Sequence, residues 1–547
     1  MPAVSAYRRA PLVNLSYTPM SDAAVHTDGL QQRLCKLALD QADPSRLSPL
    51  DAVLATKLGG YTEAPAMPAL DRKEDTRAYV ENLCAGAMIS AMARDKQGML
   101  DVLEGVKAFH SLLPSLSEEQ LFYVGADALR LTMDLYRRTG QPFLLNLMED
   151  LRSRLPDVSG VMHMFPFQRA YQPEKEAHAA EEAAYYARMQ RFATGKYMAD
   201  ALAMTALLSQ YSGSGRDAAA SRAGLVALMR YHGMPSGAFS ADPYLAGRDP
   251  ARALELDAAC AQTEAYLDAL LTTGDVAMAD ALERMMQNVL PDLLSEKGVR
   301  TLTPTNRLAS DDSCQWQKPA RQDLSALLRA LYAVRRAVWL ARDDASLCYM
   351  LPLDGGCLTR LNGVPVRLTA RVEGCWQRKV TLRVECKQPV SFTLHLHVPG
   401  YADGARVSVN GGRAQEAAPG ELCAVSRTFQ TGDTVTLQLD VTPRVQTGYR
   451  GSVSVYAGAQ LLALPLPTDD CAWRYALICS GNRTPVEENG QPFALMTACE
   501  APGWQTKAGF ILPPPQGAPL GPAYELTLVP AAGVDGRIAA FPCATER

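Results

Sequence analysis

Two different patterns of hydrophobic and polar residues divide the chain. From about Gln31 to Arg342, apolar residues recur at spacings of three and four, as in SRAGLVALMRYH and DLSALLRALYAVRRAVWLA. Ala, Leu, Met, Arg and Glu, which favour helices, are frequent in this part. Because one such stretch follows another, the first part of the chain is predicted to be all-helical.

A weak internal repeat indicates how these helices are connected. TGKYMADA, which begins at Thr194, returns as TGDVAMADA at Thr273, and YRRTGQPFLLNL around Thr139 is a looser third copy. Each copy is interpreted as a helix that ends at glycine, a short loop and a new helix. Stacked hairpins of this kind predict a closed α/α toroid, an (α/α)6-type barrel, over residues 1–345.

After about Ser346 the apolar residues alternate with polar ones instead. VPVRLTARVEG, KVTLRVECKQ, VSFTLHLHVPG and DTVTLQLDVTPRV are separated by turn residues, which is typical of antiparallel strands. They predict a β-sandwich over residues 346–446. Residues 447–547 are expected to form a second sandwich or an appended sheet, and residues 10–20, with VNLSY, to add a strand to a sandwich. The fold class is therefore multidomain α+β.

The composition argues against a nucleic-acid-binding protein and against a membrane protein. The 547 residues are 48% hydrophobic and carry a formal net charge of −4, so the basic excess of a nucleic-acid-binding protein is missing. No apolar run has the length of a signal peptide or a membrane span, which predicts a cytoplasmic protein without a membrane partner. The thirteen cysteines are scattered singly, so most are expected to be reduced.

From roughly Tyr123 onward the chain resembles glycoside hydrolase family 127, the bacterial β-L-arabinofuranosidases. The segments that carry the resemblance are VTLRVECKQPVSFTLHLHVPGYADGARVSVNGG, FQTGDTVTLQLDVTPRV, HGMPSGAFSADPYLAGRDP and LLTTGDVAMADALERMMQNVLPD. The resemblance implies a carbohydrate or glycoside as partner and hydrolysis by a zinc-bound cysteine thiolate. It further implies that a glutamate and three cysteines hold the zinc, and that a carboxylic acid protonates the leaving oxygen.

The chain departs from this pattern at the residues that matter for chemistry. Cys260 matches the first cysteine ligand, but the glutamate expected two positions earlier falls on Ala258. Of the paired cysteines expected in SDDSCQWQKPARQD only Cys314 is present. The expected acid falls on Pro243, beside Asp242.

Two interpretations of the cysteines stay open. Either Cys260 and Cys314 form a zinc site completed by a nearby carboxylate, or they are two buried thiols without metal. The carboxylates available to complete such a site are Asp257, Glu255, Asp311 and Asp312. The candidate catalytic residues are Asp242, Asp257, Glu264 and Cys314.

The candidate substrate-binding residues are His178, His232, Tyr244 and Trp316. His178 lies where the family has a sugar-contacting histidine, and His232 precedes a Gly-Met-Pro turn. The alternative is that each histidine caps or packs against a helix end.

Two functional hypotheses follow. The first is a glycoside hydrolase relative that binds or hydrolyses a sugar in the cavity of the barrel without the full zinc–cysteine site. The second is a catalytically inactive sugar-binding or scaffolding subunit of a homo- or hetero-oligomer.

Overall fold

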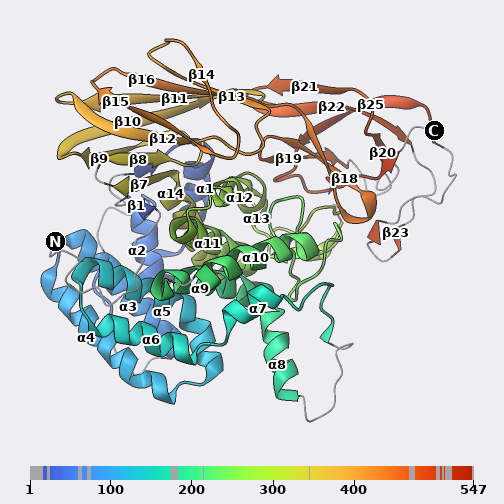
Figure 1. Cartoon of the computed structure of the whole chain (residues 1–547). Helices are drawn as coiled ribbons and strands as arrows, with labels where there is room; N and C mark the ends of the chain where they lie inside the picture. Colours follow the sequence, from blue (N-terminus) through green and yellow to red (C-terminus); the bar gives the residue numbers. More distant parts are fainter. Residues whose placement is uncertain are drawn as a thin grey trace.

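The computed structural model places a helical half beneath two β-rich parts that lie side by side (Figure 1). This arrangement confirms the predicted fold class, with helices first and sheets afterwards. The structure describes residues 17–20, 25–59, 65–70, 75–173, 183–213, 215–308, 310–343, 345–466, 475–500, 506–507, 510–511 and 520–544.

Within the described residues, six helices contact one another in a closed inner ring, each touching the next. In ring order they are α2 (Pro49–Lys57), α3 (Thr76–Ala93), α5 (Glu118–Thr139), α9 (Gly195–Ser212), α11 (Leu256–Thr273) and α14 (Arg321–Val338). Further helices pack against members of this ring, which gives the double-layered helical barrel that the repeat predicts. These outer helices are α1 (Gly29–Asp40), α4 (Lys96–Leu112), α6 (Phe143–Arg154), α10 (Gly215–His232) and α12 (Ala277–Arg284).

Local signals define where the inner helices begin and end. Ser117 accepts a hydrogen bond from the Gln120 amide, and the Gln120 side chain bonds back to the Ser117 amide, so a capping box starts α5. Gly140 and Gly274 end α5 and α11 in the left-handed conformation, as predicted for those two copies of the repeat.

The copy of the repeat that begins at Thr194 is different. Gly195 opens α9 instead of ending a helix. A Cβ atom on Gly195 would lie 2.2 Å from the Cβ of Ala241 and 2.9 Å from that of Ala258. The glycine is therefore required by close packing of the start of α9 against α11 and the preceding loop.

The β-sandwich consists of two sheets that lie one above the other and share the main hydrophobic core (Figure 1). The five-stranded sheet has the order β1 (Thr18–Pro19), β7 (Trp339–Asp343), β8 (Ser346–Tyr349), β12 (Val390–His397) and β15 (Leu422–Phe429). The seven-stranded sheet has the order β14 (Gln415–Glu416), β13 (Gly404–Val409), β16 (Thr434–Asp440), β11 (Gln377–Cys386), β10 (Val364–Glu373), β9 (Gly355–Leu361) and β2 (Val25–Thr27). The four expected strand segments are β10, β11, β12 and β16; β12 pairs antiparallel with β15 but parallel with β8.

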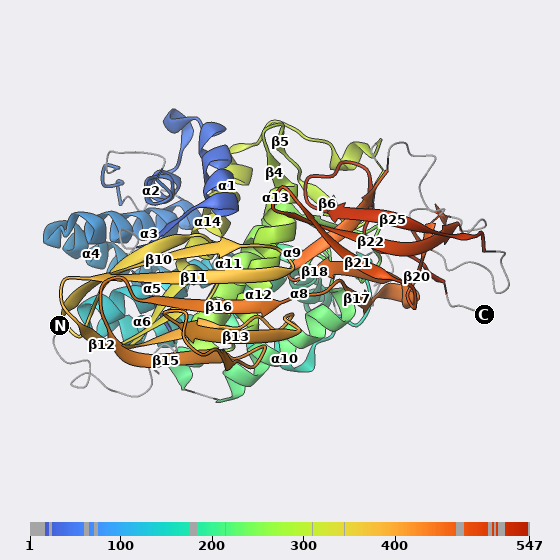
Figure 2. The same cartoon turned by 90° about the horizontal axis from the view of Figure 1, so that it is seen from above.

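The C-terminal part is built on one nine-stranded sheet beside the sandwich (Figure 2). Its strands are β17 (Arg444–Thr447), β18 (Val453–Ala457), β19 (Gln460–Pro465), β20 (Tyr475–Ile478), β21 (Arg483–Glu488), β22 (Gln491–Glu500), β25 (Ala523–Pro530), β26 (Arg537–Ile538) and β27 (Cys543–Ala544). Among the helices that the structure describes, none combines the length and the apolar character needed to cross a membrane.

Candidate functional site

Charged side chains from several inner helices gather around Asp257, in the first turn of α11. The charges that act on Asp257 are those of Lys196, Asp200, Asp323 and Arg77, which come from α9, α14 and α3. Since each lies near the start of its helix, the N-terminal ends of these helices face the same region. We call the five residues the mouth cluster.

The mouth cluster contains charges of both signs, which act on Asp257 in opposite directions. Burial is the largest effect on Asp257 and raises the pKa of its carboxyl group, and the nearby carboxylates of Asp323 and Asp200 act in the same direction. Lys196 opposes this shift, and its Nζ is 2.6 Å from Asp200 Oδ2. The region therefore combines the Lys196–Asp200 ion pair with a carboxyl group, that of Asp257, whose pKa is raised.

The loop before α11 adds two further carboxyl groups. Asp242 is ion-paired with Arg252 at 2.5 Å and accepts a hydrogen bond from the Ala253 amide at 3.1 Å. Glu255 stands at the N-cap of α11, and its pKa is raised by burial and by the charges of Asp257 and Asp242. Asp242 is thus fixed by partners, whereas Glu255 and Asp257 are the carboxyl groups inclined to carry a proton.

Below the mouth, five charged residues of α5, α11 and α14 form a second group, which we call the bore cluster. They are Asp127, Arg130, Glu264, Asp268 and Arg329. Each keeps 10 to 21% of its side chain accessible, so water reaches into the helical ring.

Within the bore cluster, Glu264 is clamped by two arginines. Its carboxylate oxygens are 2.8 Å and 3.0 Å from Arg329 and 3.0 Å from Arg130. Burial pushes the pKa of Glu264 upward, but the two guanidinium groups outweigh burial and leave it below its usual range. Glu264 is therefore held as an anion, which suits hydrogen-bond acceptance better than proton donation.

The two candidate metal-binding cysteines have surroundings that favour the thiol. Cys260 is buried in the main core, and burial raises the pKa of its thiol well above the usual value. Cys314 ends a short 3-10 turn, its Sγ lies 3.6 Å from Asp311 Oδ2, and burial raises its pKa as well. A zinc ligand must instead be a thiolate.

The other expected ligands of zinc are also missing. Ala258 stands where the resemblance expects a glutamate, and the start of α9 fills the space beside it. No group of three or more His, Cys, Asp or Glu side chains suited to a metal ion occurs in the described part of the chain. The residues present do not fit the zinc centre that the resemblance implies.

His232 makes two hydrogen bonds in the interior. Nδ1 accepts from the Gly247 amide at 3.0 Å, so the other ring nitrogen, Nε2, carries the proton and donates to the Phe167 carbonyl at 2.7 Å. Both ring nitrogens are engaged in joining the loop to α10. His178 lies outside the described residues.

Tyr244 and Trp316 lie in different places. Tyr244 accepts a hydrogen bond from Gln190 at 2.9 Å, packs against Tyr171, and bridges its backbone to Thr194, next to the start of α9. It is therefore close to the mouth cluster. The Trp316 indole donates to Asp535 at 3.0 Å, so this side chain faces the C-terminal sheet.

Several residues of the site were not predicted from the sequence. Lys196, Asp200 and the arginines of the bore cluster were missed, as was the aromatic pair Tyr123 and Tyr197, whose rings lie 5.0 Å apart. The available signal was the presence of single charges on otherwise apolar faces of helices, as in Asp127 and Arg130, three residues apart in α5.

Comparisons with known proteins find one similar family model and several similar structures. The profile described as "Beta-L-arabinofuranosidase, GH127 middle domain" matches residues 355–441, which run from β9 to the end of β16 in the β-sandwich. No curated protein matches the chain in sequence.

Solved structures match over nearly the whole chain. A protein titled "Glycoside hydrolase" has a TM-score of 0.74 at 14% identity, with 99% of both chains covered. The GH127 beta-arabinofuranosidase BT3674 has a TM-score of 0.60 at 14% identity, with 97% of this chain and 98% of the other covered. A GH127 beta-L-arabinofuranosidase from Geobacillus stearothermophilus T6 has a TM-score of 0.57 at 13% identity, with 97% and 100% covered. These matches identify the fold.

Proposed function

For this GH127-like, glycoside hydrolase-like protein, we propose that the mouth of the helical barrel binds a sugar or glycoside and does not use a zinc-bound thiolate. The observation that carries the proposal is the mouth cluster, with Lys196, Asp200 and Asp257 beside Tyr244. Sugar hydroxyls are bound by charged and polar side chains that both donate and accept, and sugar rings pack on aromatic side chains. The bore cluster extends this polar, water-accessible surface into the barrel.

Thiolate chemistry has little support in this site. Attack on the anomeric carbon needs a cysteine that loses its proton easily, whereas the pKa values of both Cys260 and Cys314 are raised. The missing zinc ligands remove the usual means of lowering them.

A second candidate function is hydrolysis by carboxyl groups at the same mouth. Glycosidases commonly use one protonated carboxyl group as acid and one carboxylate as nucleophile or base. Glu255 and Asp257 are the candidate pair: burial raises the pKa of both, and the charge of Asp257 raises that of Glu255 further, which favours Glu255 as the acid and Asp257 as the carboxylate.

The test is calorimetric titration with L-arabinose and methyl β-L-arabinofuranoside, together with an assay for release of the sugar. We expect saturable binding by the unmodified protein, weakened at least tenfold, about 1.4 kcal/mol, in Asp257→Asn and Lys196→Met. Lys107→Met is the matched control, because Lys107 makes a similar ion pair with Glu104 on the outer surface.

Each outcome has a definite meaning. Binding without turnover supports a sugar-binding protein, and turnover lost in Asp257→Asn but kept in Cys314→Ser supports carboxyl-based hydrolysis. Absence of binding, or binding unchanged in both mouth variants, would overturn the proposal. Turnover lost in Cys314→Ser, together with stoichiometric zinc by elemental analysis, would restore the thiolate mechanism.

A further inference from the structure

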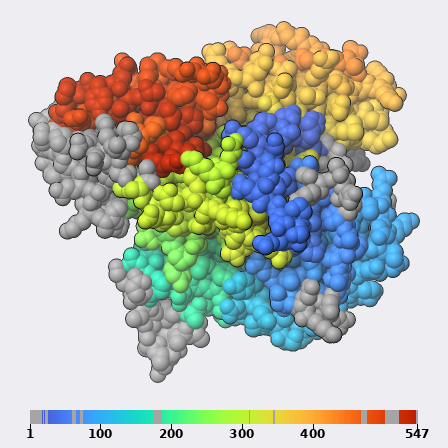
Figure 3. Space-filling model, turned by 180° about the vertical axis from the view of Figure 1, so that it is seen from behind, coloured from blue at the N-terminus to red at the C-terminus, as the bar shows by residue number. Residues whose placement is uncertain are grey.

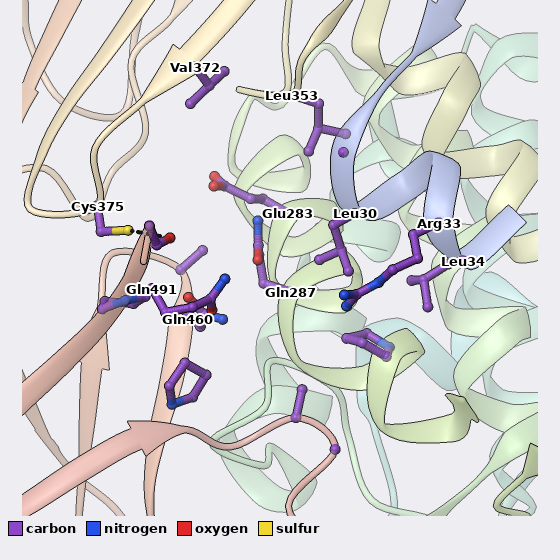
Figure 4. A pocket seen from close by; sticks show the side chains of 18 of the residues that line it. Leu30, Arg33, Leu34, Glu283, Gln287, Leu353, Val372, Cys375, Gln460 and Gln491 are labelled. Atoms are coloured by element: carbon purple, nitrogen blue, oxygen red, sulfur yellow. Dashed lines mark hydrogen bonds between the residues drawn. The ribbon is translucent and has the colours of Figure 1, made fainter. Parts of the chain in front are cut away.

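A large cleft, which has no lining residue in common with the mouth cluster, lies where the helical half, the sandwich and the C-terminal sheet meet (Figure 4). Its volume of about 1050 Å³ is just above the range for ligand pockets, which is roughly 300–1,000 Å³. We propose that this inter-domain cleft is a second binding site, which takes a neutral oligosaccharide.

Three glutamine side chains reach into the cleft from its two sides. Gln287 comes from the helical half, and Gln460 and Gln491 come from the start of β19 and β22 in the C-terminal sheet (Figure 4). A primary amide presents two donors and an acceptor in one plane, which matches the mixed donor and acceptor character of neighbouring sugar hydroxyls.

Gln287 lies in an irregular turn of its helix. Met285–Val289 is a π-helical turn between α12 and α13 (Leu290–Leu293), and the Leu290 amide donates to the carbonyl of Met285, five residues earlier. Pro291 has no amide hydrogen, so it cannot continue the α-helical bonding pattern back to Gln287. Single π-helical turns of this kind are frequent at functional sites.

The residue beside Gln287 fixes the opposite wall. Asn288 donates to the Ala459 carbonyl at 2.9 Å and accepts from the Leu461 amide at 2.8 Å. These two bonds flank Gln460, so the Gln287 and Gln460 side chains are held as neighbours across the domain boundary.

The third glutamine is held in a similar way from the sandwich. At the turn between β10 and β11, the Cys375 amide donates to Glu487 at 2.8 Å, and its thiol lies 3.2 Å from the Gly490 carbonyl. Gly490 directly precedes Gln491, so the edge of the cleft at Gln491 is tied to the sandwich.

Trp316 supplies an aromatic surface to the same cleft. The Arg300 guanidinium covers one face of its indole at 3.8 Å, and Asp535 fixes the ring nitrogen at 3.0 Å. A half-buried indole held in this manner can stack on a sugar ring without losing further side-chain freedom.

The charges around the cleft select against an acidic ligand. Acidic side chains outnumber basic ones among the lining residues, and Glu283 on the helical side is already satisfied by Arg378 and Tyr401. A uronic acid chain or a phosphate would meet net repulsion, whereas a neutral glycan would not.

The test is titration with neutral tetrasaccharides (xylotetraose, arabinotetraose and cellotetraose) and with tetragalacturonate as the charged counterpart. We expect at least one neutral tetrasaccharide to bind, with affinity reduced at least tenfold in Gln287→Ala/Gln460→Ala and in Gln491→Ala. Gln377→Ala, at an exposed position of β11, is the matched control. A ligand-induced change in tryptophan fluorescence should disappear in Trp316→Phe.

The mouth variant Asp257→Asn separates this site from the one under "Proposed function". Binding of the tetrasaccharide should survive in Asp257→Asn, because the two sites share no residue. Failure of all neutral tetrasaccharides to bind, binding of tetragalacturonate alone, or equal affinity in the glutamine variants and Gln377→Ala would overturn the second site. Loss in Asp257→Asn alone would assign the binding to the mouth instead.

Discussion

The environment of His232 fixes a single neutral form of its ring. Burial lowers the pKa of His232 to about 4, although the bond to the Phe167 carbonyl acts in the opposite direction. In the unfolded chain the ring titrates near 6.5. Between these values the unfolded state binds more protons, so stability should fall as the pH falls from about 6.5 to 4, by about 3 kcal/mol.

This residue gives a direct pH test. The free energy of unfolding, measured with urea, should be lower at pH 4.5 than at pH 7.5 in the unmodified protein. His232→Gln has no titrating ring at this position, so its decline should be smaller by most of the loss of about 3 kcal/mol. An equally steep decline in the variant would mean that other groups cause the acid sensitivity.

Cys479 and Cys543 lie close enough to react with each other. Their sulfur atoms are 2.8 Å apart; Cys479 directly follows β20, and Cys543 begins the neighbouring strand β27. With oxidised glutathione as oxidant, both thiols should be consumed and two molecules of reduced glutathione released, which cross-links the C-terminal strand. Intact mass should fall by two hydrogen atoms, and Cys543→Ser should instead keep its mass or gain one glutathione.

At the residue scale, the sequence predicted some of the residues of interest but not their partners in the structure. The sequence indicated His232 and Tyr244 as residues near a turn, and singled out Cys260 and Cys314. It gave no means to find the partners of His232, because Phe167 is 65 positions away. The pairing of Cys479 with Cys543 was missed for the same reason, since hydrogen-bonded neighbours in a sheet need not be close in sequence.

At the scale of the helix, periodicity predicted the inner helices but not which faces meet. The bore cluster forms because α5, α11 and α14 each present charges to the same interior space. Arg329 contacts both Asp127 and Glu264, so its removal leaves two carboxylates without a principal partner. Such a loss typically costs about 3–5 kcal/mol.

Arg329→Met should therefore lower the free energy of unfolding by an amount in that range, measured in urea. The matched control is Arg138→Met on the outer surface, where Arg138 and Asp134 are 47% and 46% exposed. Pairs of that kind contribute about 0–1 kcal/mol. Similar small effects in both variants would show that water already screens the bore cluster.

At the scale of the whole molecule, the sequence pattern predicted helices followed by sheets. Apolar residues recur at spacings of three and four in the first part of the chain and alternate with polar residues in the second. It did not predict that the last strands return to the segment that follows α13. Figure 3 shows these two parts of the chain in contact, with the C-terminal strands in red against the yellow-green segment around residue 300. The contact includes long-range ion pairs, such as those of Arg300 with Asp535 and of Arg537 with Asp292, which leave no periodic trace in the sequence.

Asp292 lies at the centre of that contact. It is fully buried, and its carboxylate is 2.8 Å from Arg307, 2.9 Å from Arg537 of β26 and 3.4 Å from Arg300. Burial alone would raise the pKa of Asp292, but the guanidinium groups of Arg537 and Arg307 hold it well below its usual range. The carboxylate therefore neutralises arginines from both the helical half and the C-terminal sheet.

Asp292→Asn keeps the shape of the side chain but leaves the three guanidinium groups without this charge. The expected cost is about 3–5 kcal/mol, and it should fall on the junction, because Arg537 belongs to the sheet and Arg307 to the segment after α13. Limited proteolysis should then cleave the C-terminal sheet before the rest of the chain.

Asp535→Asn is the control for this prediction. Asp535 touches Arg300 and Lys297 but is 44% exposed, so the cost of its substitution should stay near 1 kcal/mol. Equal protease resistance of Asp292→Asn and the unmodified protein would mean that apolar packing, not this carboxylate, holds the two parts together.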